Sequence, residues 1–260
     1  ALGEACLRNC SDYWDRKIEP AGHDCSITHL YLDESVRDWY GDSTTLLLAR
    51  TNYQLRQFYG RLKDMGIPYL STRGGSPWNA PSRNGAFYSL LMLEQRRAIT
   101  EPEWASVLRL KELPVKYGDQ QFLVQGTKSA WKKRTMGESL ANLDDLGDWG
   151  ATDFLKGLIA GGTWQEFMPF ADTYCRAIET HGLDVVNNPR VTVSTIHGAK
   201  GLEADNAVLL DTTSGIVSRA AEEPMQKNEE HRLAYVGVTR ARRQLTIVSD
   251  PRAAFRMEIG

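Results

Sequence analysis

The 260-residue chain lacks the sequence marks of several classes of protein. No apolar run approaches the ~20 residues that a membrane-spanning helix needs, and the N-terminal segment ALGEACLRNC lacks the basic and apolar parts of a secretory signal peptide. The phosphate loop Gly-x-x-x-x-Gly-Lys-Ser/Thr occurs nowhere. The net charge of −2 excludes a histone-like polycation, although a local basic stripe could still bind an anionic partner. We therefore expect a cytoplasmic protein with no membrane partner.

The cysteines are few and form no Cys-x-x-Cys pair. Cys6 and Cys10 lie one helical turn apart on an expected helix over residues 1–17, where a nearby Asp or His could complete a metal site. Reduced, partly buried thiols are the favoured interpretation, because such thiols are ordinary in cytosolic proteins. We predict no metal site in this chain.

One pair of carboxylates also has two interpretations. An expected strand over residues 26–32 ends in Asp33-Glu34, which resembles a Walker B motif. Since the chain has no phosphate loop for such a motif to serve, we favour Asp33 as the cap of a short helix over residues 34–39.

Both ends of the chain alternate between strand and helix patterns. Residues 44–49 (TTLLLA) are continuously apolar, which is typical of a buried parallel strand. The capping box of Thr51 with Gln54 predicts a helix over residues 51–65, and a strand over residues 67–71 completes a β-α-β unit. The expected buried stripe of the helix comprises Leu55, Phe58, Tyr59, Leu62 and Met65. Further predictions are strands at residues 191–195, 207–210 and 244–248, a loop over 214–226 and a helix capped by Asn228.

The middle of the chain has mainly helical patterns. Residues 86–97 carry an apolar face, and Thr100 with Glu103 forms a capping box for a helix over residues 102–110. Because this helical part lies between two α/β parts, we interpret it as an insertion.

Two more features lie within that insertion. The pair Thr163 and Glu166 predicts a further capping box, opening a helix that runs to His181 and ends at Gly182. The run Lys132-Lys133-Arg134 could bind phosphates or could form a solvated basic turn.

A glycine-rich stretch, TIHGAKGLE at residues 195–203, follows an expected strand. Gly198 and Gly201 allow a tight turn in which backbone N–H groups approach an anion, and Lys200 adds a positive charge. The other donors in the stretch are Thr195 and His197. Ligands of open α/β sheets bind at the carboxyl ends of strands, where this turn is expected. The alternative is a glycine-rich turn with a solvated lysine.

The last predicted helix brings an arginine to its end. In EEHRLAYVGVTRA, residues 229–241, the packing face comprises Leu233, Val236 and Gly237. A guanidinium at Arg240 can neutralise charge that builds on a phosphoryl oxygen. The alternative is stabilisation of the helix end by cations, because Arg240, Arg242 and Arg243 all suit the negative end of a helix dipole.

These segments resemble motifs of the UvrD/Rep-like superfamily 1 DNA helicases. TIHGAKGLE resembles motif V, and EEHRLAYVGVTRAR resembles motif VI. LLLARTNYQLRQFYGRLKDMGIPYLSTRGG, residues 46–75, resembles motif IV with the segment that follows it. The motifs occur in the family's order, with a helical insertion at the family's insertion point. The resemblance covers residues 44–75 and 191–249 well.

The resemblance implies a fold and a division into domains. The fold is an α/β, RecA-like parallel sheet of the P-loop-NTPase type, called domain 2A, interrupted by a mainly helical 2B-like insertion. Domain 2A is expected at residues 1–85 and 188–260, and the insertion at residues 86–187. The family's partner domain, 1A, carries the phosphate loop, the Walker B carboxylates and most of the Mg²⁺ chemistry, and none of these is in this sequence.

The resemblance also implies residue roles. Arg50 and Arg240 match the arginines that contact the γ-phosphate of ATP, and are the implied catalytic residues. The implied cofactor-binding residues are Glu203, Gly201, Arg50 and Arg240, with ATP and Mg²⁺ as cofactors. The implied contacts with single-stranded DNA are Thr195, His197, Gly198 and Lys200. Thr239 and Glu230 are implied to position the motif VI helix. The chain departs from the family at Ala49, where relatives stack an aromatic ring on adenine, and at Ala204, where they have phenylalanine.

The implied function is the C-terminal half of an ATP-dependent, UvrD-like DNA helicase or translocase, serving DNA repair or replication. Its partners are single-stranded DNA and domain 1A, its location is a bacterial or phage-type cytoplasm and nucleoid, and the isolated chain is expected to be inactive. One alternative is a non-catalytic module that binds DNA or protein. Others are the helicase portion of a helicase–nuclease, and a small-molecule α/β enzyme, for which no nucleophile–base pair is apparent.

Overall fold

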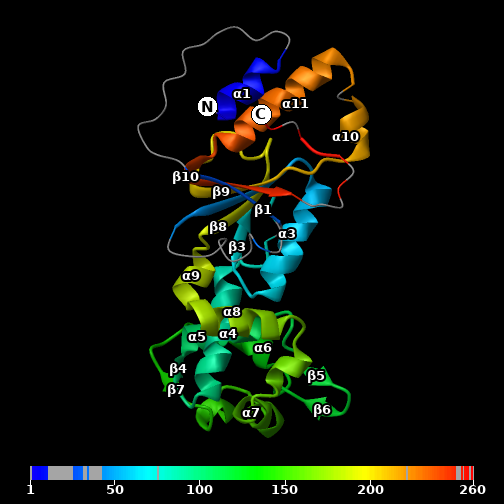
Figure 1. The fold of residues 1–260 in the computed structure, drawn as a ribbon. Helices are drawn as coiled ribbons and strands as arrows, with labels where there is room; N and C mark the ends of the chain where they lie inside the picture. Colours follow the sequence, from blue (N-terminus) through cyan, green and yellow to red (C-terminus); the bar gives the residue numbers. More distant parts are fainter. Residues whose placement is uncertain are drawn as a thin grey trace. The chain divides into compact units, whose positions relative to one another are not determined.

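The computed structural model describes most of the chain, and the described residues fall into two compact units (Figure 1). The first unit comprises Ala1–Ser76 with Pro189–Gly260, and the second comprises Pro77–Asn188. The described residues are 2–10, 26–31, 34, 43–74, 76–220, 222–249, 253, 255–257 and 259. The second unit begins before residue 86, the predicted start of the insertion, because its first helix already begins at Pro81. The 2B-like character of this unit stays a prediction.

The first unit is built on a six-stranded sheet with the strand order β1-β10-β9-β2-β8-β3. Its strands are β1 (Ser26–Tyr31), β2 (Thr45–Ala49), β3 (Tyr69–Ser71), β8 (Val191–Thr195), β9 (Ala204–Leu210) and β10 (Ala241–Ser249). Every neighbouring pair in this sheet is parallel. The predicted α/β class with a parallel sheet is therefore confirmed. Strands β9 and β10 begin earlier than predicted, because Ala204 and Ala241 already pair with each other.

Strand β2 lies inside the sheet and is covered on both faces. All of its residues are buried, as its continuous apolar run predicted. Leu46 and Leu48 share a buried cluster with Leu233 of helix α11 (Pro224–Val238). Because side chains alternate across a strand, Leu47 faces the other side, where helix α3 (Asn52–Asp64) packs against β2 and β8 (Figure 1).

Helix α3 confirms most of its prediction. The backbone N–H and the hydroxyl of Thr51 both donate to Gln54 Oε1 at 2.9 Å, which is one half of the predicted capping box. The side chains of Leu55, Phe58 and Leu62 are buried, and Tyr59 is half-buried. Met65 is 44% exposed, so its place in the predicted stripe was wrong. The helix has ended at Asp64, and Met65 is its C-cap residue.

Helix α1 (Leu2–Arg8) packs against α11 at the face opposite α3 (Figure 1). It is shorter than the predicted helix over residues 1–17, of which residues 11–17 lie outside the described part. Cys6 and Cys10 are both buried, and the Cys10 thiol donates to the backbone carbonyl of Asn228 at 3.5 Å. Among the described residues, no group of three or more His, Cys, Asp or Glu side chains could hold a metal ion. Cys25, Asp33 and residues 35–39 lie outside the described part, so the predicted cap at Asp33 does too.

The second unit is mainly helical. Its elements are α4 (Pro81–Glu94), β4 (Ile99–Thr100), α5 (Glu101–Arg109), β5 (Lys116–Tyr117), β6 (Gln120–Gln121), α6 (Thr127–Lys133), β7 (Leu140–Ala141), the 3₁₀ turns η2 (Asp145–Gly147) and η3 (Trp164–Phe167), and the helices α7 (Asp153–Ala160), α8 (Ala171–His181) and α9 (Leu183–Asn187). Aromatic rings fill its core, with Tyr174 stacked on Phe87 at 4.7 Å and in edge contact with Trp78 at 5.1 Å between ring centroids. Burial raises the pKa of the neighbouring Cys175 thiol, which favours the unreactive protonated form.

Two predicted capping boxes in this unit have different outcomes. At α5 the prediction is confirmed, since Thr100 N–H donates to Glu103 Oε2 at 2.6 Å and Glu103 N–H donates to Thr100 Oγ1 at 3.4 Å. At Thr163 it was wrong, because a 3₁₀ turn forms there and α8 begins at Ala171. Pro169 explains the break, since a proline disfavours helical backbone in the residue before it. Helix α8 ends at His181 and is closed by Gly182, as predicted, with a φ of +81° at Gly182.

The basic run in this unit is divided between two environments. Lys132 and Lys133 are exposed at the end of α6. Arg134 pairs with the buried Glu101 at 2.5 Å and lies over the Trp131 ring, 4.7 Å from its centroid. Arg134 is therefore a structural residue. Among the described residues, no helix is long and apolar enough to span a membrane.

Candidate functional site

The carboxyl edge of the parallel sheet brings two predicted segments together. In the register of β2 with β8, Ala49 is the partner of Thr195. The N–H of Ile196 donates to the carbonyl of Ala49 at 3.0 Å. Arg50, which follows β2, therefore begins beside the glycine-rich turn that follows β8.

The glycine-rich turn is held by hydroxyl groups. Gly198 N–H donates to Thr195 Oγ1 at 3.1 Å, and the hydroxyls of Ser194 and Thr72 are hydrogen-bonded at 2.7 Å. A Cβ atom on Gly198 would lie 2.8 Å from Ser194 Oγ and 3.2 Å from the hydroxyls of Thr195 and Thr72. The close approach of these groups explains the glycine at this position.

The predicted DNA-side residues lie on this turn with different exposures. Thr195 is half-buried, whereas His197, Gly198 and Lys200 are exposed. The structure also places Arg73 at this edge, exposed and just after β3. Sequence reasoning missed Arg73 and the Thr72 hydroxyl, because nothing in the local sequence shows that the end of β3 lies beside β8.

Residues 196–203 cross from the carboxyl edge of the sheet to its amino edge. They connect β8 to the parallel strand β9, and β2 lies between those two strands. Ile196 and Ala199 are fully buried in the cluster that includes Leu233 and Val238 of α11. Gly201 has φ of +86°, which a glycine adopts freely. The predicted cofactor residue Glu203 therefore lies at the opposite edge from His197.

Arg240 lies at that amino edge, just past the end of α11. Its backbone carbonyl accepts from Ala204 N–H at 3.1 Å. Its guanidinium donates to the carbonyls of Val236 at 2.8 Å and Leu202 at 2.9 Å, and to Thr239 Oγ1 at 3.0 Å. The side chain thus closes the carboxyl end of the helix, which was the alternative to a phosphate contact. Its acceptors among the described residues are all neutral, so none of these contacts is an ion pair.

Glu203 lies near Arg240 at this edge, because the residue after it, Ala204, donates its N–H to the carbonyl of Arg240. Glu203 accepts from Arg242 Nε at 3.2 Å and is half-exposed. The next carboxylate, Asp205, accepts from the backbone N–H and the hydroxyl of Thr44 at 3.1 and 2.9 Å. Those hydrogen bonds, the backbone one above all, lower the pKa of Asp205. The amino edge therefore carries the carboxylates of Glu203 and Asp205 close to Arg240 and Arg242.

Arg50 takes part in a different contact. Its Nε and Nη2 donate to both carboxylate oxygens of Glu230, with distances of 3.2, 2.9 and 2.7 Å. Both side chains are largely buried, at 19% and 22% exposure. Glu230 belongs to α11, ten residues before Arg240, which corresponds to about 15 Å along a helix.

The structure therefore does not bring Arg50 and Arg240 together. The resemblance implied that both contact one γ-phosphate, which requires two guanidinium groups within a few ångströms. The parallel strands instead place Arg50 after the end of β2 and Arg240 before the start of β10, at opposite edges of the sheet. The joint assignment of the two arginines to one phosphate stays a prediction that this arrangement does not support.

Helix α11 is longer than predicted. Residues 214–226 were predicted as a loop, but they contain helix α10 (Gly215–Ala220) and the first turn of α11. Asn228 does not cap α11, since it is buried inside the helix and Glu223 is the N-cap residue. Pro224 starts the helix, because proline at the first helical position is already fixed at a helical φ.

The predicted packing face of α11 is confirmed in part. Leu233 and Gly237 are buried, and Val236 is half-buried against the same cluster. A Cβ on Gly237 would lie 3.2 Å from both methyl groups of Leu209, so the helix approaches β9 closely. Ala49 and Ala204, the two departures from the family, are both buried in the sheet.

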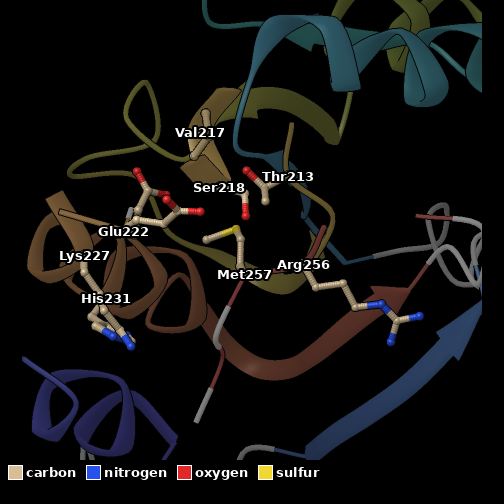
Figure 2. Close-up of a pocket in the computed structure, with 9 residues that line it drawn as sticks. Thr213, Val217, Ser218, Glu222, Lys227, His231, Arg256 and Met257 are labelled. Carbon is tan, nitrogen blue, oxygen red and sulfur yellow. The ribbon is translucent and has the colours of Figure 1, made fainter. Parts of the chain in front are cut away.

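A cavity of about 440 Å³ lies between α10 and α11 (Figure 2). Its lining comprises Thr213, Val217, Ser218, Glu222, Lys227, Glu230, His231, Arg256 and Met257. Sequence reasoning missed this cavity, because it expected a loop in place of α10. Glu230 lines it and also binds Arg50, so one carboxylate borders both features.

Part of the chain is similar to known proteins. Residues 166–250 match the family model of the UvrD-like helicase C-terminal domain. DNA helicase II of Haemophilus influenzae is 46% identical over 59 residues, which are 22% of this chain and 8% of that protein. ATP-dependent DNA helicase PcrA of Bacillus subtilis is 41% identical over 61 residues, 23% of this chain and 8% of that protein. ATP-dependent DNA helicase UvrD2 of Mycobacterium tuberculosis is 28% identical over 212 residues, 79% of this chain and 27% of that protein.

These matches cover a small part of each relative, at most 27% of the length of those three proteins. The matched residues 166–250 contain the glycine-rich turn, Glu203 and Arg240, but not Arg50.

Proposed function

We propose, from the UvrD-like helicase C-terminal region that this chain carries, that the whole protein is an ATP-dependent DNA helicase or translocase. In this proposal the first unit is its RecA-like domain 2A and the second unit is its 2B-like insertion. The observation that carries the proposal is the crossover 196–203. It joins a turn with His197 and Lys200 at one sheet edge to Glu203, beside Arg240, at the other.

The amino edge is the proposed nucleotide side. Arg240 donates only to neutral acceptors among the described residues, so its guanidinium is in no ion pair there and fits an anionic phosphate oxygen. ATP and Mg²⁺ would be bound mainly by a domain 1A that supplies the phosphate loop, and Glu203 with Gly201 would face the nucleotide. Arg240 would exchange its hydrogen bonds to the helix end for bonds to the γ-phosphate, and so stabilise charge in the transition state.

The carboxyl edge is the proposed nucleic-acid side. Thr195, His197, Gly198 and Lys200 would contact the backbone of single-stranded DNA through hydroxyl, imidazole, backbone N–H and ammonium donors. Since Arg50 emerges at the same edge, it belongs with this group rather than with Arg240. The exposed His197 and Lys200 support this assignment.

Replacement of Arg240 tests the nucleotide side. In the whole protein, Arg240→Ala should reduce DNA-stimulated ATP hydrolysis by on the order of 10³-fold, because an arginine finger contributes about that much to the rate. The matched control is Arg243→Ala, an exposed arginine near the same strand start, which should retain activity close to wild type. An Arg240→Ala rate equal to wild type would remove the proposed role.

A further inference from the structure

We propose that Glu230 is a positioning residue, which holds the Arg50 guanidinium in place to contact a phosphate of single-stranded nucleic acid at the carboxyl edge. This inference rests on the proposed function and adds to it a residue that acts through Arg50. The resemblance had implied for Glu230 a role in placing its own helix.

The contact between the two side chains fixes the guanidinium plane. Nε and Nη2 of Arg50 share one edge of that plane, and both donate to the Glu230 carboxylate at distances from 2.7 to 3.2 Å. A two-point contact of this kind restricts rotation of the arginine, which a single hydrogen bond does not. The low exposure of the pair, 19% and 22%, limits competition by water.

The same contact leaves part of the guanidinium for a ligand. An arginine has five N–H donors, and the carboxylate engages those of Nε and Nη2. Nη1 has no hydrogen bond to a described residue of the chain. Its two donors can therefore bind a phosphate oxygen without breaking the ion pair.

The position of Arg50 identifies the chemistry of that ligand. Arg50 starts beside Ile196, next to the turn that carries His197 and Lys200. Exposed cations at this edge and donors from the turn suit a chain of phosphates, and a phosphate contact fixes the register of a nucleic acid. Because Glu230 balances the charge of Arg50, the pair offers a directed donor, and Lys200 supplies net positive charge.

The charge of Glu230 allows an experiment to distinguish a positioning role from a purely electrostatic effect on binding. The change Glu230→Gln removes one negative charge near a bound polyanion, which by itself strengthens binding. Loss of the two-point contact frees the Arg50 side chain to rotate, and that weakens binding because the arginine must be ordered again. The two explanations therefore predict opposite signs for one variant.

The experiment measures equilibrium binding of the whole protein to a fluorescent oligothymidylate at fixed, moderate salt. We expect Arg50→Gln and Glu230→Gln each to weaken binding about tenfold, the usual size of one charge-assisted hydrogen bond. The double variant should bind no more weakly than Arg50→Gln alone, because Glu230 acts through Arg50. Glu230→Asp keeps the charge and should bind with intermediate affinity.

Glu229→Gln is the matched control, since Glu229 is the exposed neighbour on the same helix and undergoes the same charge change. It should bind at least as tightly as wild type. Equal or tighter binding by Glu230→Gln, or additive losses in the double variant, would overturn the positioning role while leaving the proposed function standing. A wild-type protein that does not bind oligothymidylate would overturn both. Far-UV circular dichroism and Tm of each variant establish that the fold is retained, and Glu230→Asp carries the test if Glu230→Gln unfolds.

Discussion

At the scale of single residues, the glycine-rich turn depends on how closely its neighbours approach. The hydroxyls of Ser194, Thr195 and Thr72 all lie within 3.2 Å of where a Cβ on Gly198 would be. The sequence TIHGAKGLE predicted a tight turn at this place, because glycine and lysine after an apolar strand are local features. It could not predict Thr72, which comes from a segment more than a hundred residues away.

A methyl group at Gly198 should therefore disturb the turn. We expect Gly198→Ala to lower the free energy of unfolding by about 1–3 kcal/mol, because overpacking of a close contact costs about that much. Gly60→Ala is the control, since a Cβ at Gly60 in helix α3 meets no atom within 4 Å. That change should raise the free energy of unfolding by about 0.5–1 kcal/mol, because alanine is the better helix former. Urea denaturation of both variants measures the difference, and equal stability would show that the turn accepts a side chain.

The Arg50–Glu230 ion pair shows where prediction at the residue scale fails. The sequence predicted that Arg50 follows a buried strand and that Glu230 lies on a helix, and both are confirmed. The contact joins residues 180 positions apart. The edge of the sheet at which Arg50 or Arg240 lies depends on how the strands are arranged in the sheet. No local sequence pattern predicts that arrangement.

At the scale of secondary-structure elements, apolar runs and capping residues predicted an element correctly where the local sequence favoured one structure only. The apolar run of β2 and the capping residues of α3 and α5 each fixed an element close to its observed bounds. The segment before α11 was mistaken for a loop, because its small and acidic residues are common in loops. Helices α10 and α11 form there because Pro224 can start a helix and because packing on the sheet stabilises α11.

Helices α5 and α6 are tied together by one buried carboxylate. Glu101, at the start of α5, accepts from the N–H of Gly137 and from Arg134, which follows α6, at 2.5 Å in each case. The hydrogen bond from Gly137 lowers the pKa of Glu101; burial opposes that shift, and Arg134 adds to it. A carboxyl with a lowered folded-state pKa contributes stability above its unfolded pKa, and this contribution is lost as the pH falls through the folded-state pKa.

Glu101→Gln should therefore destabilise the protein at pH 7 and much less in acid. Denaturation at pH 7 and near pH 3 measures the difference in the free energy of unfolding between variant and wild type. We expect that difference to shrink as the pH drops below the ordinary glutamate pKa of about 4.3. Glu138→Gln, at an exposed glutamate close in sequence, should change stability little at either pH. A difference for Glu101→Gln that does not depend on pH would contradict the ionised, hydrogen-bonded carboxylate.

At the scale of the whole molecule, the described residues divide into a sheet-based unit and a mainly helical unit. The sequence predicted this division, because two α/β parts flank a helical one. Its boundary differs at Pro77, since proline and tryptophan there begin the packing of the second unit. The proposed nucleotide site is incomplete in this chain, because the sequence contains Arg240 and Glu203 but no phosphate loop.

The 260-residue chain alone should therefore show no Mg²⁺-dependent ATP hydrolysis. The reason is that the groups that would hold the β- and γ-phosphates and the metal ion are not in this sequence. Phosphate release by the purified chain, with and without oligothymidylate, measures this, and the whole protein serves as the positive control. Turnover that persists through purification and is lost in Arg240→Ala would show that the chain carries a complete site.

The ion pair at Glu230 and the position of Arg240 past the end of α11 link a tilt of this helix to the position of Arg240. Arg50 binds α11 at Glu230, and Arg240 follows the carboxyl end of that helix about 15 Å away, so Glu230 can serve as a pivot for Arg240. A tilt of about 5° around that pivot moves the far end by about 1.3 Å, which is enough to make or break a hydrogen bond to an oxygen atom. Under the proposed function, phosphates bound at Arg50 on one edge of the sheet would therefore change how far Arg240 extends at the other edge.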